Sequence, residues 1–553
     1  MASKFSDTRS RDPSLSNAKP PLATREGSIE TGEVTPGSSP LQPGEQTHRG
    51  FKPRHAQMIS LGGAIGTSLF LGTAQVLRVG GPGFLLLAYG LLSIMVYGIV
   101  TAIAEVGTYL PVTGGTMSYY GNKYVSRSFG FAMGYLYWYS LGILVPYELV
   151  AINLLIDYWS LSPAVSPAVW ITVLLVMITA LNFLPARMFG EAEFWSAGMK
   201  ILLILGLIFL SVVLFFGGGP NRDMLGFRYW KDPGATKSYL AEGSSGRFVG
   251  FLQAVVLSSF AFVLAPEYLI VTAGEMQSPR YTLPRAAERY FWRLILLFIP
   301  IVIGIGVICP NNDPQLSASG TAKSPFVIAI RHAGIPVLDH IVNAMILLSA
   351  ATAGNAFLYQ SSRNLYSLAV CGDAPAIFKK CNRHGLPYMA VGVSSLFSLL
   401  AYLSLSSTSL VVFNWFINIT NTAGYISWIC CGVIYAKFKK AAKYHGVESP
   451  YRPWIQPYGI YFGTFGSVIL LFINGFTVFF PGQWSVSDFL TAYVGIPAFL
   501  LIYAGHRLYH RSDGWVRKPE DIDMFEGLDE VLAAERPPPA RGWLASKLMV
   551  LIE

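Results

Sequence analysis

Residues 56–76 read AQMISLGGAIGTSLFLGTAQV, and this stretch decides the fold that we expect for the chain. A helix needs about 20 mostly apolar residues to cross a bilayer, so the stretch is long enough to span. Yet Gly62, Gly63 and Gly66 interrupt it, and a glycine in a helix interior costs about 1 kcal/mol relative to alanine. In lipid, the backbone groups freed by such an interruption must be satisfied by protein or by a wet cavity. A broken spanning helix therefore predicts a site that holds a small polar ligand inside the membrane.

The rest of the chain has the composition of a membrane protein. Its 553 residues are 52% hydrophobic and only 13% charged, which is too apolar for a soluble multidomain protein. Apolar stretches of roughly 17 to 28 residues recur along it, each near the length that crosses a bilayer. We expect an all-α integral membrane protein with twelve transmembrane helices, at residues 56–76, 83–109, 129–158, 168–184, 193–216, 247–274, 288–309, 336–361, 388–404, 410–436, 457–480 and 485–506. The loop after the ninth span is so short that a re-entrant pair is an alternative there.

The chain has a net charge of +9, and its basic residues are distributed unevenly between the two sets of loops. One set carries clusters such as Lys379, Lys380 and Arg383, and the other carries about half as many Lys and Arg residues. Because the basic loops of membrane proteins stay in the cytoplasm, we expect both termini to be cytoplasmic. The basicity then reflects topology, and we expect no nucleic-acid partner.

The composition also divides the chain. Residues 1–50 are rich in Ser, Thr, Pro and Gly, which predicts a disordered cytoplasmic N-terminal tail. Residues 51–508 form the expected transporter domain of twelve helices, and residues 509–553 form a cytoplasmic C-terminal tail. These tails are the places where trafficking or ubiquitination machinery could bind.

A second interruption lies in the sixth span, where residues 255–275 read VVLSSFAFVLAPEYLIVTAGE. Pro266 lies in its middle, and proline removes an N–H donor and clashes with the preceding turn. The first and sixth spans are five apart, which is the spacing that two five-helix repeats of opposite topology would give. We therefore expect the ligand to bind between broken helices 1 and 6.

Several stretches in this order match a known pattern of motifs. They are LGGAIGTSLFLG (61–72), GGPGFLLLAY (80–89), AEVGTYLPVTGG (104–115), FGFAMGYLYWYS (129–140), EAEFWSAGMKILLILGLI (191–208), AGEMQSPRYTLPRA (273–286) and WFINITNTAGYISWICCGVIYAKFKKA (415–441). This pattern resembles the fungal amino-acid permease family, within the amino acid–polyamine–organocation superfamily. The resemblance runs from about residue 50 to residue 530.

The resemblance implies a LeuT-like 5+5 inverted repeat with broken helices 1 and 6. It also implies proton-driven import of amino acids at the plasma membrane by alternating access. One departure concerns the sixth span, where Ala265 and Pro266 stand at the positions of the usual Gly-Thr pair. The resemblance therefore predicts the fold more securely than the choice of substrate. The apolar neighbourhood of the sixth span favours substrates with neutral side chains, proline among them.

A zwitterionic amino acid needs donors for its carboxylate and acceptors for its ammonium group. A broken helix offers unpaired N–H groups at the positive end of a half-helix dipole. We assign the carboxylate to the first break and the ammonium group to carbonyls of the sixth span, with Phe262 as a candidate gate. The predicted substrate-binding residues are Ala64, Ile65, Gly66, Thr67, Ser68, Phe260, Ala261, Phe262 and Asn418. Close packing of helices through small residues is the alternative for the first break.

Ionisable residues inside spans are expensive and usually functional or paired, so they are candidates for proton coupling. Glu148 closes a helical stripe with Tyr137, Leu141 and Leu144, which predicts that the four face the bundle interior together. Three further candidates are Glu105, Glu267 and Lys200; the resemblance implies that a lysine at this place stands in for a bound sodium ion. Snorkelling is the alternative for Lys200, and a structural hydrogen bond is the alternative for Glu105.

Asn418 belongs to a polar stripe of the tenth span, together with Asn414, Asn421 and Tyr425. A polar stripe facing lipid is costly, so these side chains either line the pathway or hold helices together.

Other classes of function remain as alternatives. A non-transporting amino-acid sensor would bind the same ligand and signal through the tails. A transporter of polyamine or choline-like cations would use carboxylates and would not need an anion-binding glycine break. Asp339, His340 and His384 are the nearest approach to catalytic groups, but no paired motif accompanies them, so we do not expect an enzyme. We expect no catalytic residues, metal or cofactor, and the expected partners are an amino acid, protons and membrane lipid.

Overall fold

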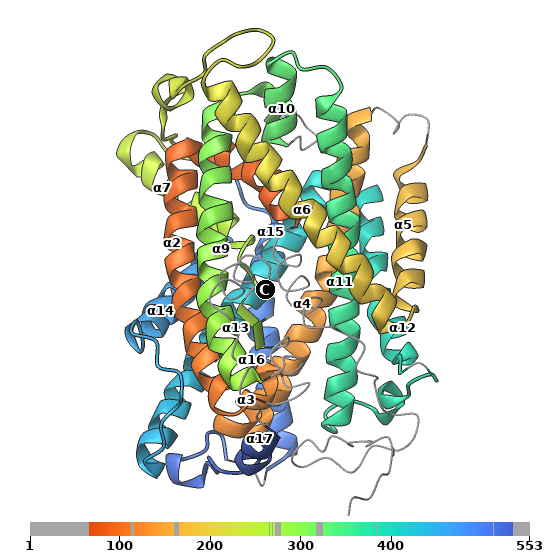
Figure 1. Ribbon diagram of the computed structural model, residues 1–553, viewed down its shortest axis with the longest axis vertical. Helices are drawn as coiled ribbons and strands as arrows, with labels where there is room; N and C mark the ends of the chain where they lie inside the picture. The colour runs from red at the N-terminus through yellow and green to blue at the C-terminus, as the bar shows by residue number, and fades with distance from the viewer. Residues whose placement is uncertain are drawn as a thin grey trace, which may run out of the picture. The chain divides into compact units, whose positions relative to one another are not determined.

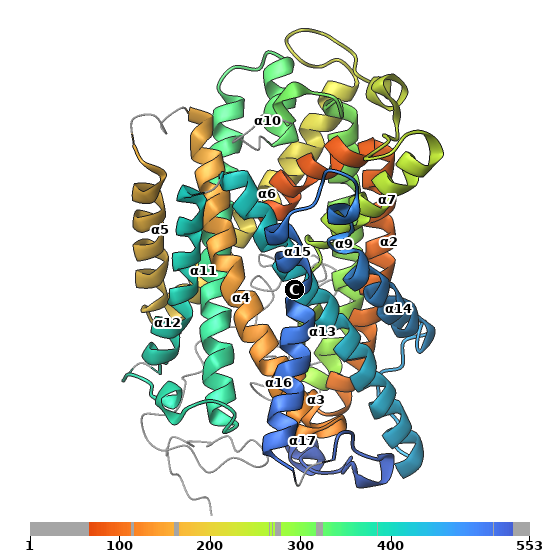
Figure 2. The ribbon, with the colours of Figure 1, turned by 180° about the vertical axis from the view of Figure 1, so that it is seen from behind.

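The structure, a computed structural model, describes residues 66–111, 116–159, 165–264, 266–267, 269–270, 278–316, 324–383, 385–406, 408–511 and 514–534. These residues form helices joined by loops, and no strand occurs among them. Most long helices run side by side along the vertical of Figures 1 and 2. The remaining residues, Ala64, Ile65 and His384 among them, lie outside the described part of the chain.

The long helices are α2 (Thr73–Tyr109), α4 (Arg127–Ile156), α5 (Pro167–Asn182), α6 (Ala186–Phe215), α7 (Gly243–Ser259), α9 (Pro279–Ile308), α11 (Leu338–Val370), α13 (Ser409–His445), α14 (Tyr458–Ile473) and α16 (Gly495–Tyr509). Shorter helices are α3 (Met117–Tyr124), α10 (Pro325–His332), α12 (Tyr388–Ser395), α15 (Val486–Tyr493) and α17 (Leu528–Ala534). A π-helix η1 (Ser68–Gly72) precedes α2, a second π-helix η3 (Trp230–Gly234) precedes α7, and 3₁₀ segments lie at η2 (Asp157–Trp159), η4 (Pro314–Leu316), η5 (Ala376–Lys379), η6 (Leu396–Leu405), η7 (Phe476–Phe479) and η8 (Pro519–Asp521).

Five helical segments in the described ranges are long and apolar enough to cross a membrane. A sixth is added if α15 and α16, which are bent by 43° at their junction, count as one span. Three shorter apolar helical stretches, at 167–182, 295–308 and 458–473, accompany them. The chain is therefore a multi-pass membrane protein, and the prediction of all-α architecture is confirmed.

The first two expected spans meet in one bent element. Helix α2 is interrupted at Gly81, whose φ of 79° lies in the left-handed region that favours glycine. The neighbouring backbone is tied to the loop before α7, because the N–H of Gly83 donates to the carbonyl of Ala235 at 2.7 Å. A Cβ at Gly81 would lie 2.9 Å from the same carbonyl oxygen, so the close approach also needs a glycine.

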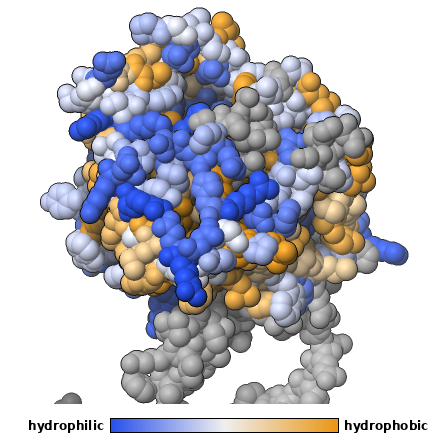
Figure 3. Space-filling view, turned by 90° about the horizontal axis from the view of Figure 1, so that it is seen from above, coloured by the Kyte–Doolittle hydropathy of each residue, from blue (hydrophilic) through white to orange (hydrophobic). Residues whose placement is uncertain are grey.

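Helix α6 has two chemically distinct faces. It crosses diagonally over α9 and α11 in Figure 1 and packs against both. Trp195, Leu202 and Phe209 are exposed on its outer face, while Glu193 and Lys200 are buried on its inner face. An apolar outer face with ionisable residues turned inward is the arrangement that lipid demands. Figure 3 shows the end of the molecule near α10 covered by hydrophilic residues, with hydrophobic residues on the flanks.

The segment of residues 515–526, which we call the C-terminal strap, packs against the opposite end of the helices. The Tyr109 hydroxyl at the end of α2 donates to the Met524 carbonyl at 2.9 Å, and the Arg517 N–H donates to the Val125 carbonyl at 2.8 Å. Ile522 and Met524 are fully buried. The sequence analysis placed this segment in a tail and did not anticipate its attachment.

Candidate functional site

Irregular backbone borders both positions where the sequence predicts a broken span. At the first position, the described residues begin with a bend at Gly66, which the π-helix η1 follows. Such π-helical turns are frequent at functional sites. Helix α7 ends at Ser259, and residues 260–264 form a turn in which Leu264 adopts a φ of 61°. A left-handed leucine is strained, since only glycine adopts this conformation freely.

These two irregular segments line one pocket, which we call the Glu148 pocket; its empty volume of about 390 Å³ includes space open to solvent. Four of the predicted substrate-binding residues lie on its lining: Gly66 and Ser68 from the first segment, and Phe260 and Ala261 from the second. The other lining residues are Leu144, Tyr147, Glu148, Val263, Phe357 and Thr420. The structure thus brings together residues that are nearly 200 positions apart in the sequence.

Glu148 is 1% exposed and is held by the first segment. The Thr67 hydroxyl donates to Glu148 Oε2 at 2.8 Å, and the backbone N–H of Thr67 also bonds to this carboxylate. A Cβ added at Gly66 would lie 3.1 Å from Glu148 Oε1. The Glu148 carboxylate therefore lies so close to the Gly66 backbone that any side chain larger than that of glycine would crowd it.

Lys200 is fully buried, so it does not snorkel to the membrane surface. It interacts electrostatically with two carboxylates, Glu193 on its own helix and Glu148 on α4. Glu193 is 2% exposed, and its Oε1 has no hydrogen-bond partner among the described residues. The sequence analysis missed Glu193, although its place seven residues before Lys200 puts both on one face of α6.

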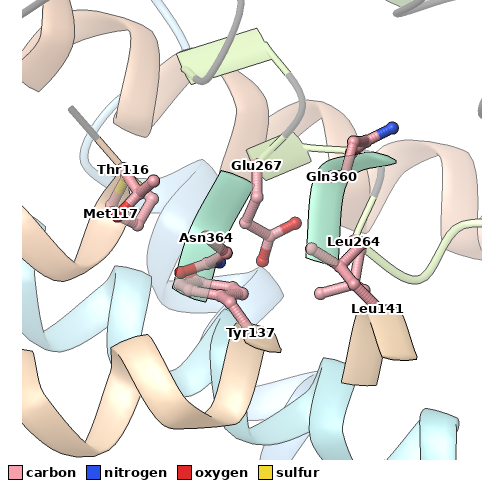
Figure 4. A pocket seen from close by; sticks show the side chains of 8 residues that line it. All are labelled: Thr116, Met117, Tyr137, Leu141, Leu264, Glu267, Gln360 and Asn364. Atoms are coloured by element: carbon pink, nitrogen blue, oxygen red, sulfur yellow. The ribbon is translucent and has the colours of Figure 1, made fainter. Parts of the chain in front are cut away.

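A second pocket, the Glu267 pocket, appears in Figure 4; its empty volume of about 310 Å³ includes space open to solvent. The Glu267 carboxylate lies in the middle of the lining, with Tyr137 and Asn364 on one side and Leu141 and Leu264 on the other. Thr116, Met117 and Gln360 complete the lining. The Ser427 hydroxyl donates to Glu267 Oε1 and itself bonds to the Tyr137 hydroxyl at 2.8 Å.

The predicted stripe on α4 connects the two pockets. Tyr137 and Leu141 line the Glu267 pocket, and Leu144 and Glu148 line the Glu148 pocket. The four residues therefore face the bundle interior together, as their helical spacing predicts.

Other predicted residues lie away from both pocket linings. Phe262 is fully buried in an aromatic cluster, with its ring 5.4 Å from Tyr89 and 5.5 Å from Phe298. Glu105 accepts hydrogen bonds from the Tyr435 hydroxyl at 2.7 Å and from Lys439 Nζ at 2.9 Å. Glu105 thus joins α2 to α13 through an ion pair.

The polar stripe of the tenth span lies on α13 and mostly bonds to neighbouring helices. Asn414 accepts from Gln75 Nε2 at 2.9 Å, Asn421 donates to the Val256 carbonyl at 3.2 Å, and Tyr425 bonds to Ser259. Asn418 contributes its backbone carbonyl to Asn474 at 2.9 Å. The pocket-lining residue of this helix is Thr420, which the sequence analysis missed; its buried hydroxyl has no partner among the described residues.

The groups that suggested catalysis have structural partners. Asp339 accepts from Arg331 Nε at 3.1 Å and from the Tyr158 hydroxyl, and the Arg331 guanidinium lies over the Tyr158 ring at 4.5 Å. His340 Nδ1 accepts a hydrogen bond from the Trp159 indole N–H at 3.0 Å. This cluster joins α10, α11 and η2 and lies on neither pocket lining.

Apolar outer faces around an interior with two carboxylate-bearing pockets define a membrane transporter. Among solved structures, a mutant of the manganese transporter of Eremococcus coleocola aligns with a TM-score of 0.50 and 10% identity, over 87% of this chain and 94% of that one. This likeness concerns the fold alone.

The sequence comparisons are more specific. The model of the amino acid permease family matches residues 55–513. Over 493 residues, the chain is 46% identical to a proline-specific permease of Emericella nidulans, covering 88% of this chain and 89% of that protein. It is 44% identical over 486 residues to a probable proline-specific permease of Schizosaccharomyces pombe, covering 86% and 88%. The chain belongs to the amino acid permease family, so it is a transporter of amino acids and not an enzyme.

Proposed function

We propose that this permease imports a neutral amino acid, proline foremost, together with protons across the plasma membrane by alternating access. The observation that carries the proposal is the Glu148 pocket, where the two irregular segments meet beside a buried carboxylate. The names of the two relatives reported above support proline as the first substrate to test.

The proposed architecture is a domain at residues 51–508 with twelve spans in a LeuT-like 5+5 inverted repeat, with cytoplasmic tails at 1–50 and 509–553. The turn at residues 260–264 and the bend at Gly66 support breaks in the sixth and first spans. Membrane lipid surrounds the domain, and the tails are the proposed contact sites for trafficking or ubiquitination machinery.

In the proposed binding mode, the substrate carboxylate binds the backbone N–H groups of residues 64–68 other than that of Thr67, which bonds to Glu148. The Thr420 hydroxyl, which has no partner among the described residues, is a further donor. The substrate ammonium or imino group binds carbonyls near Phe260 and Ala261. Apolar and aromatic side chains, Leu144, Tyr147, Val263 and Phe357 with Phe260, form the rest of the lining. A charged substrate side chain would lose its hydration against these walls, which favours a neutral one.

Proton coupling is proposed to act through Glu148. Deprotonated Glu148 attracts Lys200, and Glu193 attracts the same lysine. A proton on Glu148 removes its charge, so the attraction between Glu148 and Lys200 is lost while that between Glu193 and Lys200 remains. Because Thr67 bonds to Glu148 through both its hydroxyl and its N–H, this change reaches the backbone that is proposed to bind the substrate. Glu267 and Glu105 are further proton-coupling candidates, with Glu267 on a pocket lining and Glu105 in an ion pair.

The test is uptake of radiolabelled proline into permease-deficient fungal cells that express the chain. We expect uptake that rises with external acidity and is lost when a protonophore collapses the gradient. Competition by each of the twenty amino acids should be strongest for proline and other small neutral ones. Uptake that is indifferent to the protonophore would remove the coupling, and binding without net flux into reconstituted vesicles would favour a sensor.

A further inference from the structure

The two pockets are neighbours separated by the turn after α7. Val263 lines the Glu148 pocket, and the next residue, Leu264, lines the Glu267 pocket. Both pockets also share α4 and α11: Phe357 lines the first, and Gln360 and Asn364 line the second. The lining residues of α4 are displaced by about seven positions, which corresponds to about 10 Å along a helix. The two pockets therefore lie next to each other along α4 and α11, on either side of the turn.

The Glu267 pocket contains buried polar atoms without partners. Glu267 is 5% exposed and Asn364 is 7% exposed. Glu267 Oε2, Asn364 Oδ1 and Gln360 Nε2 have no hydrogen-bond partner among the described residues. Buried polar groups in native proteins are almost always satisfied, so three such atoms on one lining are available to bond a ligand or solvent.

We infer that the Glu267 pocket is a second subsite for the transported amino acid, occupied between the Glu148 pocket and release. This inference rests on the proposed function, and its geometric basis is a carboxylate, two amides and an apolar wall on one lining. Glu267 Oε2 and Asn364 Oδ1 accept from the substrate ammonium or imino group, and Gln360 Nε2 donates to the substrate carboxylate. Met117, Leu141 and Leu264 contact the side chain.

The same lining argues against other ligands. A carboxylate without a cationic side chain on the lining repels an inorganic anion. A metal ion would need several carboxylate, His or Cys ligands, and no group of three such residues occurs among the described residues. A zwitterion needs one acceptor group and one donor group beside an apolar wall, which is what the lining offers.

The pocket also lies on the side expected for release. It is lined by α3 and by the second half of α11, and α3 contacts the C-terminal strap, since Lys123 Nζ donates to Glu526 Oε2 at 3.3 Å. With both termini cytoplasmic, this end of the molecule faces the cell interior. The strained Leu264 stands at the boundary of the two pockets, so a change of its backbone would connect them.

The test compares exchange of labelled proline from the two faces, in right-side-out and inside-out plasma-membrane vesicles. Asn364→Leu keeps the approximate volume and removes the amide. We expect the half-saturation concentration on the cytoplasmic face to rise about tenfold, and that on the external face to change less than twofold. Ser349→Ala is the matched control, because Ser349 is a fully buried α11 residue whose hydroxyl lacks a partner among the described residues and which lines neither pocket.

The outcomes separate the inference from the proposed function. Equal changes on both faces, or none on either, would overturn the subsite. A variant that changes only the ratio of protons to proline would also overturn it, because the pocket would then hold solvent for proton transfer. Gln360→Leu provides a second variant if Asn364→Leu fails to reach the membrane, with the same expected asymmetry. A native chain that exchanges no amino acid would overturn the proposed function and the inference with it.

Discussion

Gly66 is the residue at which an added methyl group acts most directly on the Glu148 pocket. A Cβ there would lie 3.1 Å from Glu148 Oε1, and Thr67 holds that carboxylate in place. We expect Gly66→Ala to lower proline uptake about tenfold and Gly66→Val to abolish it, because Glu148 has to move to admit the larger side chain. The measurement is labelled uptake, normalised to the amount of protein at the cell surface.

The control for this prediction lies in the same segment. Gly72 ends the π-helix, and a Cβ added there meets no atom within 4 Å. Gly72→Ala should therefore transport at close to the native rate. Normal affinity in Gly66→Val would refute the assignment of the substrate carboxylate to this backbone.

The Thr67 hydroxyl offers a second test at the scale of one atom. A hydrogen bond to a charged group contributes about 1.5–3 kcal/mol, so Thr67→Val should lower the maximal uptake rate about tenfold or more, and Thr67→Ser should restore it. Thr108→Val is the control, since Thr108 in α2 is as fully buried as Thr67 but its hydroxyl has no partner among the described residues. Equal uptake by the two valine variants would contradict the prediction.

At the scale of single residues, helical spacing is the most informative signal in the sequence. It sufficed to put Tyr137 and Glu148 on one interior face, and the same arithmetic over EAEFWSAGMK would have paired Glu193 with Lys200. Spacing does not fix how a helix is rotated against its neighbours. For that reason we selected Asn418 on α13, whereas the packing of that helix turns Thr420 to the pocket.

At the scale of elements, α2 and α14 pack closely at a pair of glycines, Gly98 and Gly459. A Cβ at Gly98 would lie 2.3 Å from the carbonyl oxygen of Gly459, and backbone cannot yield as a flexible side chain can. Gly98→Ala should therefore separate the helices and cost about 1–3 kcal/mol, measured as a lower melting temperature of the purified protein in detergent. Gly90→Ala, on the same helix with no atom within 4 Å of the new Cβ, should leave the melting temperature unchanged or slightly raised. Equal melting temperatures would mean that this contact does not limit stability.

The C-terminal strap has a pH dependence that Asp523 sets. The Phe525 N–H donates to its carboxylate at 2.8 Å and the Glu526 N–H at 3.1 Å, and these bonds hold the pKa of Asp523 below its ordinary value of 3.8. A lowered pKa in the folded state stabilises the strap above pH 3.8, and this stabilisation is lost as the pH falls through the folded value. We expect amide protection of residues 515–526 in hydrogen exchange to decline below that pH.

Asp523→Asn separates this effect from general acid unfolding. The variant should show weaker strap protection already at neutral pH, because an amide accepts these bonds less strongly than a carboxylate. It should also lack the additional decline in acid. An identical pH profile in the native chain and the variant would assign the decline to other groups.

The sequence predicted where the helices lie more accurately than it predicted where they end. Pro266 predicts a break, but α7 already ends at Ser259, seven residues earlier and beyond the four preceding residues that a proline disturbs. The left-handed Leu264 could not be predicted, since its conformation is held by the surrounding fold against the preference of leucine. The strap was missed because its apolar anchors, Ile522 and Met524, are too few to form a pattern.

For the whole molecule, the orientation in the membrane decides which pocket serves entry of the amino acid and which serves its release. Cys371 is exposed at the end of α11, on the side that we expect to be cytoplasmic, and Lys231 is exposed in the loop before α7, on the opposite side. In intact cells, a membrane-impermeant maleimide should label Lys231→Cys in a Cys371→Ser background and should leave the native chain unlabelled. After permeabilisation the native chain should be labelled, and Cys371→Ser should lose most of that signal. Labelling of Cys371 from outside would invert the topology, and the Glu267 pocket would then be the place where the amino acid enters.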